Sequence, residues 1–271
     1  MSSQEEIRGM LRGPTGYPEV EQLLDRLLAE VRTVLGDELI GFYLYGSLSL
    51  GDFDPASSDI DFLVATRGVL SAATLAALGQ MHARIAASGL PFAGRLEGSY
   101  IPLRALRRYD PTDNIHPTIG MDWEFGLGPH KTNWILERHI LREHGHALFG
   151  PPPRDLIDPV APDDLRAATR EMLLGFWAQQ LDGPEPDWLR TREYQAFAML
   201  TMCRALHTLS EGMVVSKRAA ADWAKRALDP AWAPLIDRAL AWRHDHAPDD
   251  MTEMLRFVAW AVEQARAADI D

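Results

Sequence analysis

Residues 43–66 read YLYGSLSLGDFDPASSDIDFLVAT, and this stretch decides the fold. The apolar run at residues 39–45 predicts a strand that leads into a turn at Gly46-Ser47. A polar loop rich in Gly, Asp, Pro and Ser separates this turn from a second apolar run at residues 60–65, which predicts another strand. The two strands therefore frame a loop whose groups suit a polar ligand.

Two acids, Asp59 and Asp61, lie at the start of the second predicted strand. Side chains of a strand alternate between its faces, so these carboxylates project to the same side. Neighbouring carboxylates repel each other unless a divalent cation lies between them, and Mg²⁺ takes one or two carboxylates together with phosphate oxygens. The Gly46-Ser47 turn offers N–H groups and a hydroxyl to those phosphates. The pattern predicts a site for nucleotidyl transfer, although Gly-Ser and Asp-x-Asp also occur in ordinary loops.

A third carboxylate is needed to complete such a site. Glu97 is the acid of the next predicted strand, residues 95–103. Its neighbours Gly98 and Ser99 are small and leave room for a ligand. A glutamate of a strand that faces solvent is the alternative interpretation. We favour the catalytic one because no other acid of that strand competes for the position.

Helical patterns surround these strands, at residues 19–35 and 70–87. The order helix, strand, strand, helix, strand predicts a small mixed sheet covered by helices. A proline-rich segment marks a boundary, because proline disrupts a helix interior. Beyond it only helical patterns remain, at residues 165–181, 193–210, 217–228, 231–242 and 252–267. We expect an α+β fold with two domains: residues 1–158 form the mixed sheet with helices, and residues 159–271 form an all-α domain.

The charge of the chain bears on its partners. Its 271 residues carry a formal net charge of −12 at pH 7, which repels nucleic acid and attracts small cationic molecules. No run of about 18 apolar residues predicts a membrane span, and the polar start MSSQEEIRGM lacks the apolar core of a signal peptide. We expect a cytoplasmic protein with no nucleic-acid or membrane partner. The histidines show no firm metal-binding pattern, and His144-x-His146 is predicted to be an exposed helix end.

The motif at residues 43–66 resembles that of the nucleotidyltransferase superfamily, which shares its fold with DNA polymerase beta. Two later stretches, LFGPPPRDLIDPV (residues 148–160) and TMCRALHTLSEGMVVSKRAAADWA (residues 201–224), are similar to the interdomain segment and second-domain signature of the streptomycin/spectinomycin adenylyltransferases. The resemblance spans most of residues 39–242. It implies an ATP- and Mg²⁺-dependent enzyme that moves AMP to a hydroxyl of a small cationic acceptor, an aminoglycoside such as streptomycin or spectinomycin.

The resemblance also implies roles for individual residues. Asp59, Asp61 and Glu97 would hold Mg²⁺, and Glu97 would act as the base that takes the proton of the attacking hydroxyl. The nucleotide would be bound by Gly46, Ser47, Ser58, Lys217 and Trp242. These residues have ordinary alternatives: the serines form turns, the lysine opens a helix in water, and the tryptophan, which replaces a family tyrosine, packs in a core.

On the acceptor side the chain departs from the resembled family. Trp123 falls near a tryptophan that lines the aminoglycoside pocket of those enzymes. The family carries substrate-binding acids just after a Pro-Asp-Trp motif, whereas here Pro186-Asp187-Trp188 is followed by the longer and more basic LRTRE at residues 189–193. Asp187 and Glu193 are expected to substitute for those acids, with an altered preference among antibiotics.

Two other functions stay open. A nucleotidyltransferase of the same fold could modify a protein hydroxyl, and a non-catalytic module could retain the fold and bind nucleotide. The helical domain of more than 100 residues favours a built-in pocket for a small acceptor. The presence of Asp59, Asp61 and Glu97 together favours catalysis. The oligomeric state does not follow from the sequence.

Overall fold

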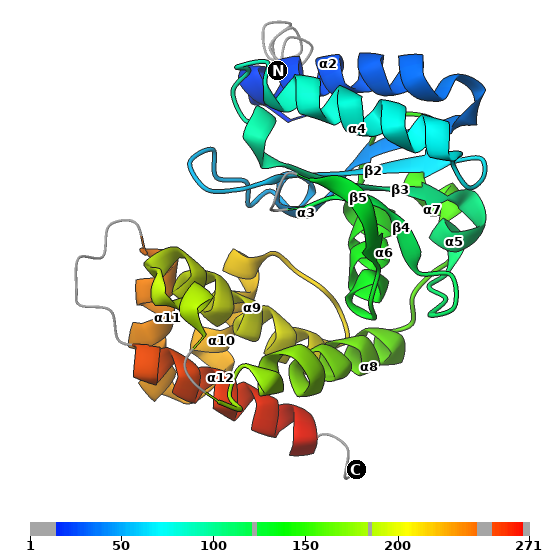
Figure 1. Cartoon of the computed structure of the whole chain (residues 1–271). Helices are drawn as coiled ribbons and strands as arrows, with labels where there is room; N and C mark the ends of the chain where they lie inside the picture. Colours follow the sequence, from blue (N-terminus) through cyan, green and yellow to red (C-terminus); the bar gives the residue numbers. More distant parts are fainter. Residues whose placement is uncertain (1–14, 121–123, 184–185, 243–250, 268–271) are drawn as a thin grey trace, which may run out of the picture. The chain divides into compact units, whose positions relative to one another are not determined.

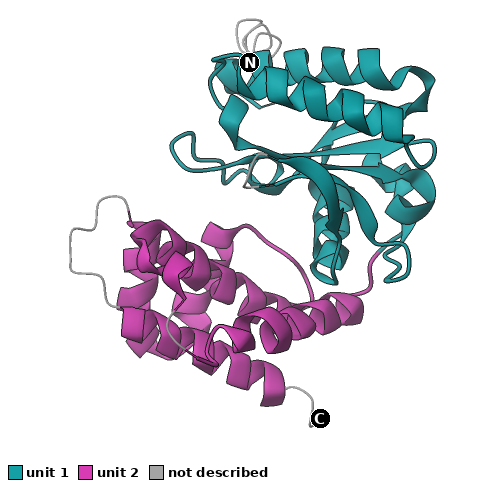
Figure 2. Ribbon diagram, viewed as in Figure 1, with its two compact units in different colours: residues 1–159 teal, residues 160–271 magenta. Residues whose placement is uncertain are grey.

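The computed structural model describes residues 15–120, 124–183, 186–242 and 251–267 (Figure 1). The chain divides into two compact units, residues 1–159 and 160–271 (Figure 2). The first unit holds a sheet with helices, and the described residues of the second form helices without strands. The predicted α+β fold class is therefore confirmed. No described helix is long and apolar enough to cross a membrane.

The sheet has six strands among the described residues, in the order β5-β4-β3-β2-β1-β6. Strands β2 and β3 are parallel, and the other neighbouring pairs are antiparallel. The strands are β1 (Leu39–Leu44), β2 (Ile60–Thr66), β3 (Leu96–Pro102), β4 (Ile115–Ile119), β5 (Phe125–Pro129) and β6 (His146–Phe149). The three predicted strands are confirmed as β1, β2 and β3, which lie side by side in the sheet.

The sequence patterns do not predict β4, β5 or β6. The first two, IHPTI and FGLGP, contain proline or glycine, and the third, HALF, has only four residues. The expectation of an exposed helix end is right for His144, the last residue of α6 (Asn133–His144), and wrong for His146. His146 begins β6, because it pairs with Leu44 of β1, about a hundred residues earlier in the chain.

One face of the sheet is covered by α2 (Pro18–Leu35) and α4 (Ala72–Ala86), which match two predicted helices (Figure 1). Gly36, at φ +50°, ends the first of them. Every second residue of the central strands packs into this core, where burial of each large side chain contributes about 1.5–3 kcal/mol. The strand residues of this core include Phe42, Leu44, Phe62, Val64 and Tyr100.

The opposite face carries two strand carboxylates. Asp61 and Glu97 lie on it, because each follows or precedes a residue of this core in its own strand, Phe62 and Leu96. Figure 1 shows α6 on this side of the sheet, next to α7 (Pro153–Leu156). Arg138 of α6 is buried and donates to two carbonyl groups of α5 (Leu103–Arg107), at 2.7 and 3.2 Å. Burial lowers the pKa of Arg138 to about 10, so its guanidinium remains charged at neutral pH.

The second unit is built around α9 (Arg192–Glu211), which packs against each of the other long helices. These are α8 (Pro162–Met172), α10 (Lys217–Ala227), α11 (Ala233–Leu240) and α12 (Met251–Ala267). The predicted helix at residues 165–181 is an α-helix only in its first part. Beyond Met172 the chain continues as a π-helix, Leu173–Trp177, a local widening that apolar spacing does not reveal.

Candidate active site

The turn after β1 is a single helical turn, α3 (Gly46–Ser49). Gly46 adopts φ +64°, a left-handed conformation that residues with a side chain rarely occupy. A Cβ atom at this position would lie 1.9 Å from Oδ2 of Asp61. The Asp61 carboxylate therefore rests against the backbone of Gly46, and glycine is required here for two independent reasons.

The parallel pairing of β2 with β3 brings Asp61 and Glu97 together. The two residues are direct partners in the register, and partners on adjacent strands lie about 4.8 Å apart with side chains on the same face. The Tyr45 N–H donates to the Asp61 carbonyl at 3.2 Å, which ties the end of β1 to the start of β2. Asp59 lies just before β2. Asp61 and Glu97 are thus brought together by the strand register, and Asp59 lies at the same end of β2; all three residues are half-buried.

The charge of a further carboxylate, that of Glu137, acts on Tyr45 together with the charges of Asp61 and Glu97. Burial raises the pKa of the Tyr45 phenol well above its usual value, and the charges of Glu137, Asp61 and Glu97 raise it further. Glu137 comes from α6, which packs against α3. The sequence analysis missed Glu137, because in sequence it resembles any acid of an amphipathic helix and only the fold brings it near β2.

The carboxylate oxygens at this end of β2 and β3 are suitable ligands for Mg²⁺. Carboxylates are the protein ligands that Mg²⁺ prefers, and it completes its shell with phosphate oxygens and water. Asp61 and Glu97 supply a carboxylate pair from adjacent strands. Within the part of the chain that the structure describes, no group of three or more His, Cys, Asp or Glu side chains forms a ready-made metal cage. The pair is the arrangement expected of a site that substrate phosphates complete.

The loop between α3 and β2 is held by its own polar groups. The Ser58 hydroxyl accepts from the Asp54 N–H at 2.9 Å, and the Ser58 N–H donates to the Asp54 carbonyl at 2.8 Å. Arg95 donates to the carbonyls of Pro55 and Ala56 at 2.9 and 3.2 Å. Ser58 therefore closes a turn, and its hydroxyl hydrogen can still serve a ligand. The other predicted serine, in α3, is half-buried.

Lys217 begins α10, after the Ser216 N-cap, whose hydroxyl accepts from the Ala219 N–H at 3.2 Å. The ammonium group lies 4.2 Å from the ring centroid of Phe197 on α9, within the range of a cation–π contact. This contact orders the lysine inside the second unit.

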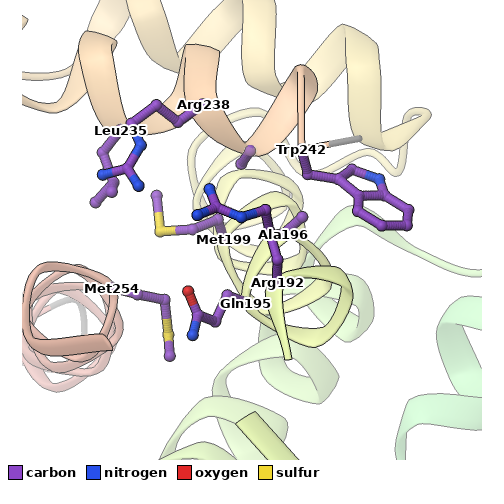
Figure 3. Close-up of a pocket in the computed structure, with 9 residues that line it drawn as sticks. Arg192, Gln195, Ala196, Met199, Leu235, Arg238, Trp242 and Met254 are labelled. Carbon is purple, nitrogen blue, oxygen red and sulfur yellow. The ribbon is translucent and has the colours of Figure 1, made fainter. Parts of the chain in front are cut away.

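Trp242 lies at one end of a small, open pocket in the second unit (Figure 3). Arg192 and Gln195 of α9 and Arg238 of α11 give this pocket a polar, cationic side. The rest is apolar, formed by Ala196, Met199, Leu235, Ala239 and Met254. Trp242 is half-buried: it lines this pocket and also packs against the hydrophobic core of the second unit.

The predicted acceptor residues are only partly described. Asp187 is almost fully exposed and pairs with Arg190 at 2.8 Å. Glu193 is exposed in the first turn of α9. Both lie in the second unit, at either end of the basic segment. Trp123 lies outside the described residues.

Comparison with known proteins gives the class. Residues 24–92 match the family described as nucleotidyltransferase domain, and residues 155–267 match the aminoglycoside adenylyltransferase C-terminal domain. The spectinomycin adenyltransferase AAD(9) from Enterococcus faecialis, solved with ATP and spectinomycin, has a similar fold. Its TM-score is 0.69 at 16% identity, over 91% of this chain and 99% of that chain. The chain therefore carries a nucleotidyltransferase domain, as the motif at residues 43–66 predicted.

Curated relatives indicate which group of nucleotidyltransferases the chain resembles. The aminoglycoside (3'') (9) adenylyltransferase of Rhizobium radiobacter is 29% identical over 268 residues, which cover 89% of this chain and 91% of the relative. The Escherichia coli enzyme of that name is 29% identical over 80% and 82% of the two chains. The spectinomycin 9-adenylyltransferase of Campylobacter jejuni is 24% identical over 82% and 84%. The chain is thus similar to the aminoglycoside adenylyltransferases over both of its domains.

Proposed function

We propose that this protein is an ATP- and Mg²⁺-dependent adenylyltransferase that transfers AMP to a hydroxyl of a small cationic acceptor, an aminoglycoside such as streptomycin or spectinomycin. The observation that carries the proposal is the pairing of Asp61 with Glu97 beside the left-handed Gly46. The curated relatives are named for this chemistry, and the net charge of −12 attracts polycations over a long range.

The residues of the first unit would perform the transfer. Asp59, Asp61 and Glu97 would hold the metal, and Glu97 would accept the proton of the acceptor hydroxyl as the hydroxyl oxygen bonds to the α-phosphorus. The bond from that phosphorus to the bridging oxygen breaks, and pyrophosphate leaves. Bound Mg²⁺ supplies positive charge that stabilises the phosphate oxygens in the transition state. Ser47 and Ser58 donate to the triphosphate.

The residues of the second unit would bind the two substrates. Lys217 neutralises phosphate charge, and Trp242 stacks on the adenine. Asp187 and Glu193, together with Trp123 of the first unit, would contact the cationic acceptor. Asp187 also pairs with Arg190, so an ammonium group of the acceptor has to displace a guanidinium there. For this reason we expect the chain to prefer one antibiotic over the other.

The Gly46→Ala variant is expected to be inactive because it displaces Asp61. The new methyl group forces the carboxylate away, and a displacement of about 1 Å can lower an enzymatic rate about 100-fold. The matched control is Gly51→Ala, since Gly51 has φ +69° and no atom within 4 Å of its Cβ position. Both variants carry a similar conformational cost of about 1–3 kcal/mol. Equal AMP transfer by the two variants, at matched melting temperatures, would contradict the role of the Gly46 contact.

The acceptor is tested by mass spectrometry of each antibiotic after incubation with the protein, ATP and Mg²⁺. We expect streptomycin or spectinomycin to gain the mass of AMP, with release of pyrophosphate. A neutral sugar of similar size serves as the control acceptor. If neither drug is modified while proteins of a lysate are, the enzyme modifies protein hydroxyls. If ATP binds and nothing is modified, the chain is a binding module.

A further inference from the structure

A chain of hydrogen bonds lies beside the proposed base, on the same face of the sheet. Ser99 is two residues after Glu97 on β3, so both side chains point to one side. The Ser99 hydroxyl bonds to Oγ1 of Thr118 on β4 at 3.2 Å and to Nε2 of His130 at 3.1 Å. Thr118 Oγ1 in turn donates to the carbonyl of Gly98, at 3.0 Å. The chain of bonds thus ends on the residue that follows Glu97.

The donor and the acceptor of each of these hydrogen bonds follow from the number of protons that each group carries. The Gly98 carbonyl can only accept, so Thr118 uses its one hydroxyl proton there. Ser99 must then donate to Thr118, and its own oxygen must accept from His130. His130 is therefore the Nε2–H tautomer. Its Nδ1 keeps a lone pair and has no partner among the described atoms.

His130 is held rigidly enough to serve as the first donor. Its ring stacks on Trp134 of α6, with centroids 3.5 Å apart and planes 7° from parallel. Its backbone N–H donates to the Asn114 carbonyl at 2.6 Å. Both His130 and Ser99 are almost completely buried. Burial lowers the pKa of His130 to about 2, which keeps the ring neutral.

Backbone pairing holds β3 on both of its sides. On one side β3 pairs with β2 over seven residues. On the other side the described residues of β4 pair with it at Gly98 and Ser99. The side-chain bonds from Ser99 and Thr118 add two ties between β3 and β4 at these positions. They restrain the backbone that carries Glu97.

We propose that His130, Ser99 and Thr118 form a positioning chain that aims the Glu97 carboxylate for proton transfer. The inference rests on the proposed role of Glu97 as the base. None of the three residues touches the reacting atoms. They act by fixing the peptide that follows Glu97, and supporting residues of this kind typically contribute a factor of about 10–100 to activity.

The test combines single variants with a double-mutant cycle. Ser99→Ala, Thr118→Val and His130→Phe should each lower kcat for AMP transfer about 10–100-fold, with unchanged affinity for ATP. His130→Phe keeps the ring stack and removes the donor, whereas His130→Gln keeps a donor near Nε2 and should restore part of the rate. In a Glu97→Gln background Ser99→Ala should cause no further loss, because coupled residues are not additive. Backbone amides 97–99 should exchange hydrogen faster in Ser99→Ala.

The matched control is His82→Phe. His82 is also buried and bonds to a β3 side chain, the Tyr100 hydroxyl, at 2.8 Å, but on the opposite face. This variant should lower the melting temperature and leave kcat unchanged. Additive losses in the cycle, or full kcat in both Ser99→Ala and His130→Phe while Glu97→Gln is inactive, would overturn the positioning chain alone. Full transfer by Glu97→Gln would instead overturn the proposed base.

Discussion

Replacing Asp61 by Asn is expected to lower AMP transfer about a thousandfold or more, which corresponds to about 4 kcal/mol of lost transition-state stabilisation. Asn keeps the size of the side chain and its position against Gly46, so the fold should survive. It removes one of the two carboxylate charges that face each other across β2 and β3. Pyrophosphate release with ATP, Mg²⁺ and acceptor measures the rate, and thermal melting checks the fold.

Two further variants test the same metal site. Asp59→Asn should behave in the same way, because both aspartates are proposed metal ligands. Asp25→Asn is the matched control, since Asp25 is an exposed acid of α2 on the far side of the sheet. Its transfer rate should equal that of the unaltered protein. Near-normal turnover by both Asp59→Asn and Asp61→Asn would refute the metal site.

Local sequence patterns predict the centre of this fold well. Alternating and apolar runs locate β1, β2 and β3, and helical spacing locates α2, α4 and the helices of the second unit. The Gly46-Ser47 turn and the Asp59–Asp61 motif are local as well, so their geometry follows from a short stretch. The pairing of Asp61 with Glu97 is different in kind. It needs the parallel register of β2 and β3, which no local pattern contains.

The missed features depend on contacts between distant parts of the chain. Strand β6 is four residues long and exists because β1 offers it an edge. Glu137 comes close enough to act on Tyr45 because α6 packs against α3. Ser99 and His130 meet across 31 residues, and each has an unremarkable neighbourhood in sequence. The acceptor residues Asp187, Glu193 and Trp123 stay predictions.

Replacing Glu97 by Gln is expected to separate binding from chemistry. Gln has nearly the same shape but cannot take a proton at neutral pH, and loss of a general base typically lowers a rate about 10²–10⁴-fold. Asp59 and Asp61 remain to hold Mg²⁺, so ATP should still bind in calorimetry. AMP transfer, measured at saturating acceptor so that weak acceptor binding cannot mimic the effect, should nearly cease.

The matched control for this variant is Glu143→Gln on α6. Glu143 pairs with Arg142 at 3.2 Å and its side chain is 43% exposed, so the same chemical change is made away from the acids of β2 and β3. Undiminished transfer by Glu97→Gln would remove this residue from the mechanism. Loss of ATP binding together with transfer would assign Glu97 to the metal rather than to the proton. Only retained binding with lost transfer identifies it as the base, because a base acts after the nucleotide is in place.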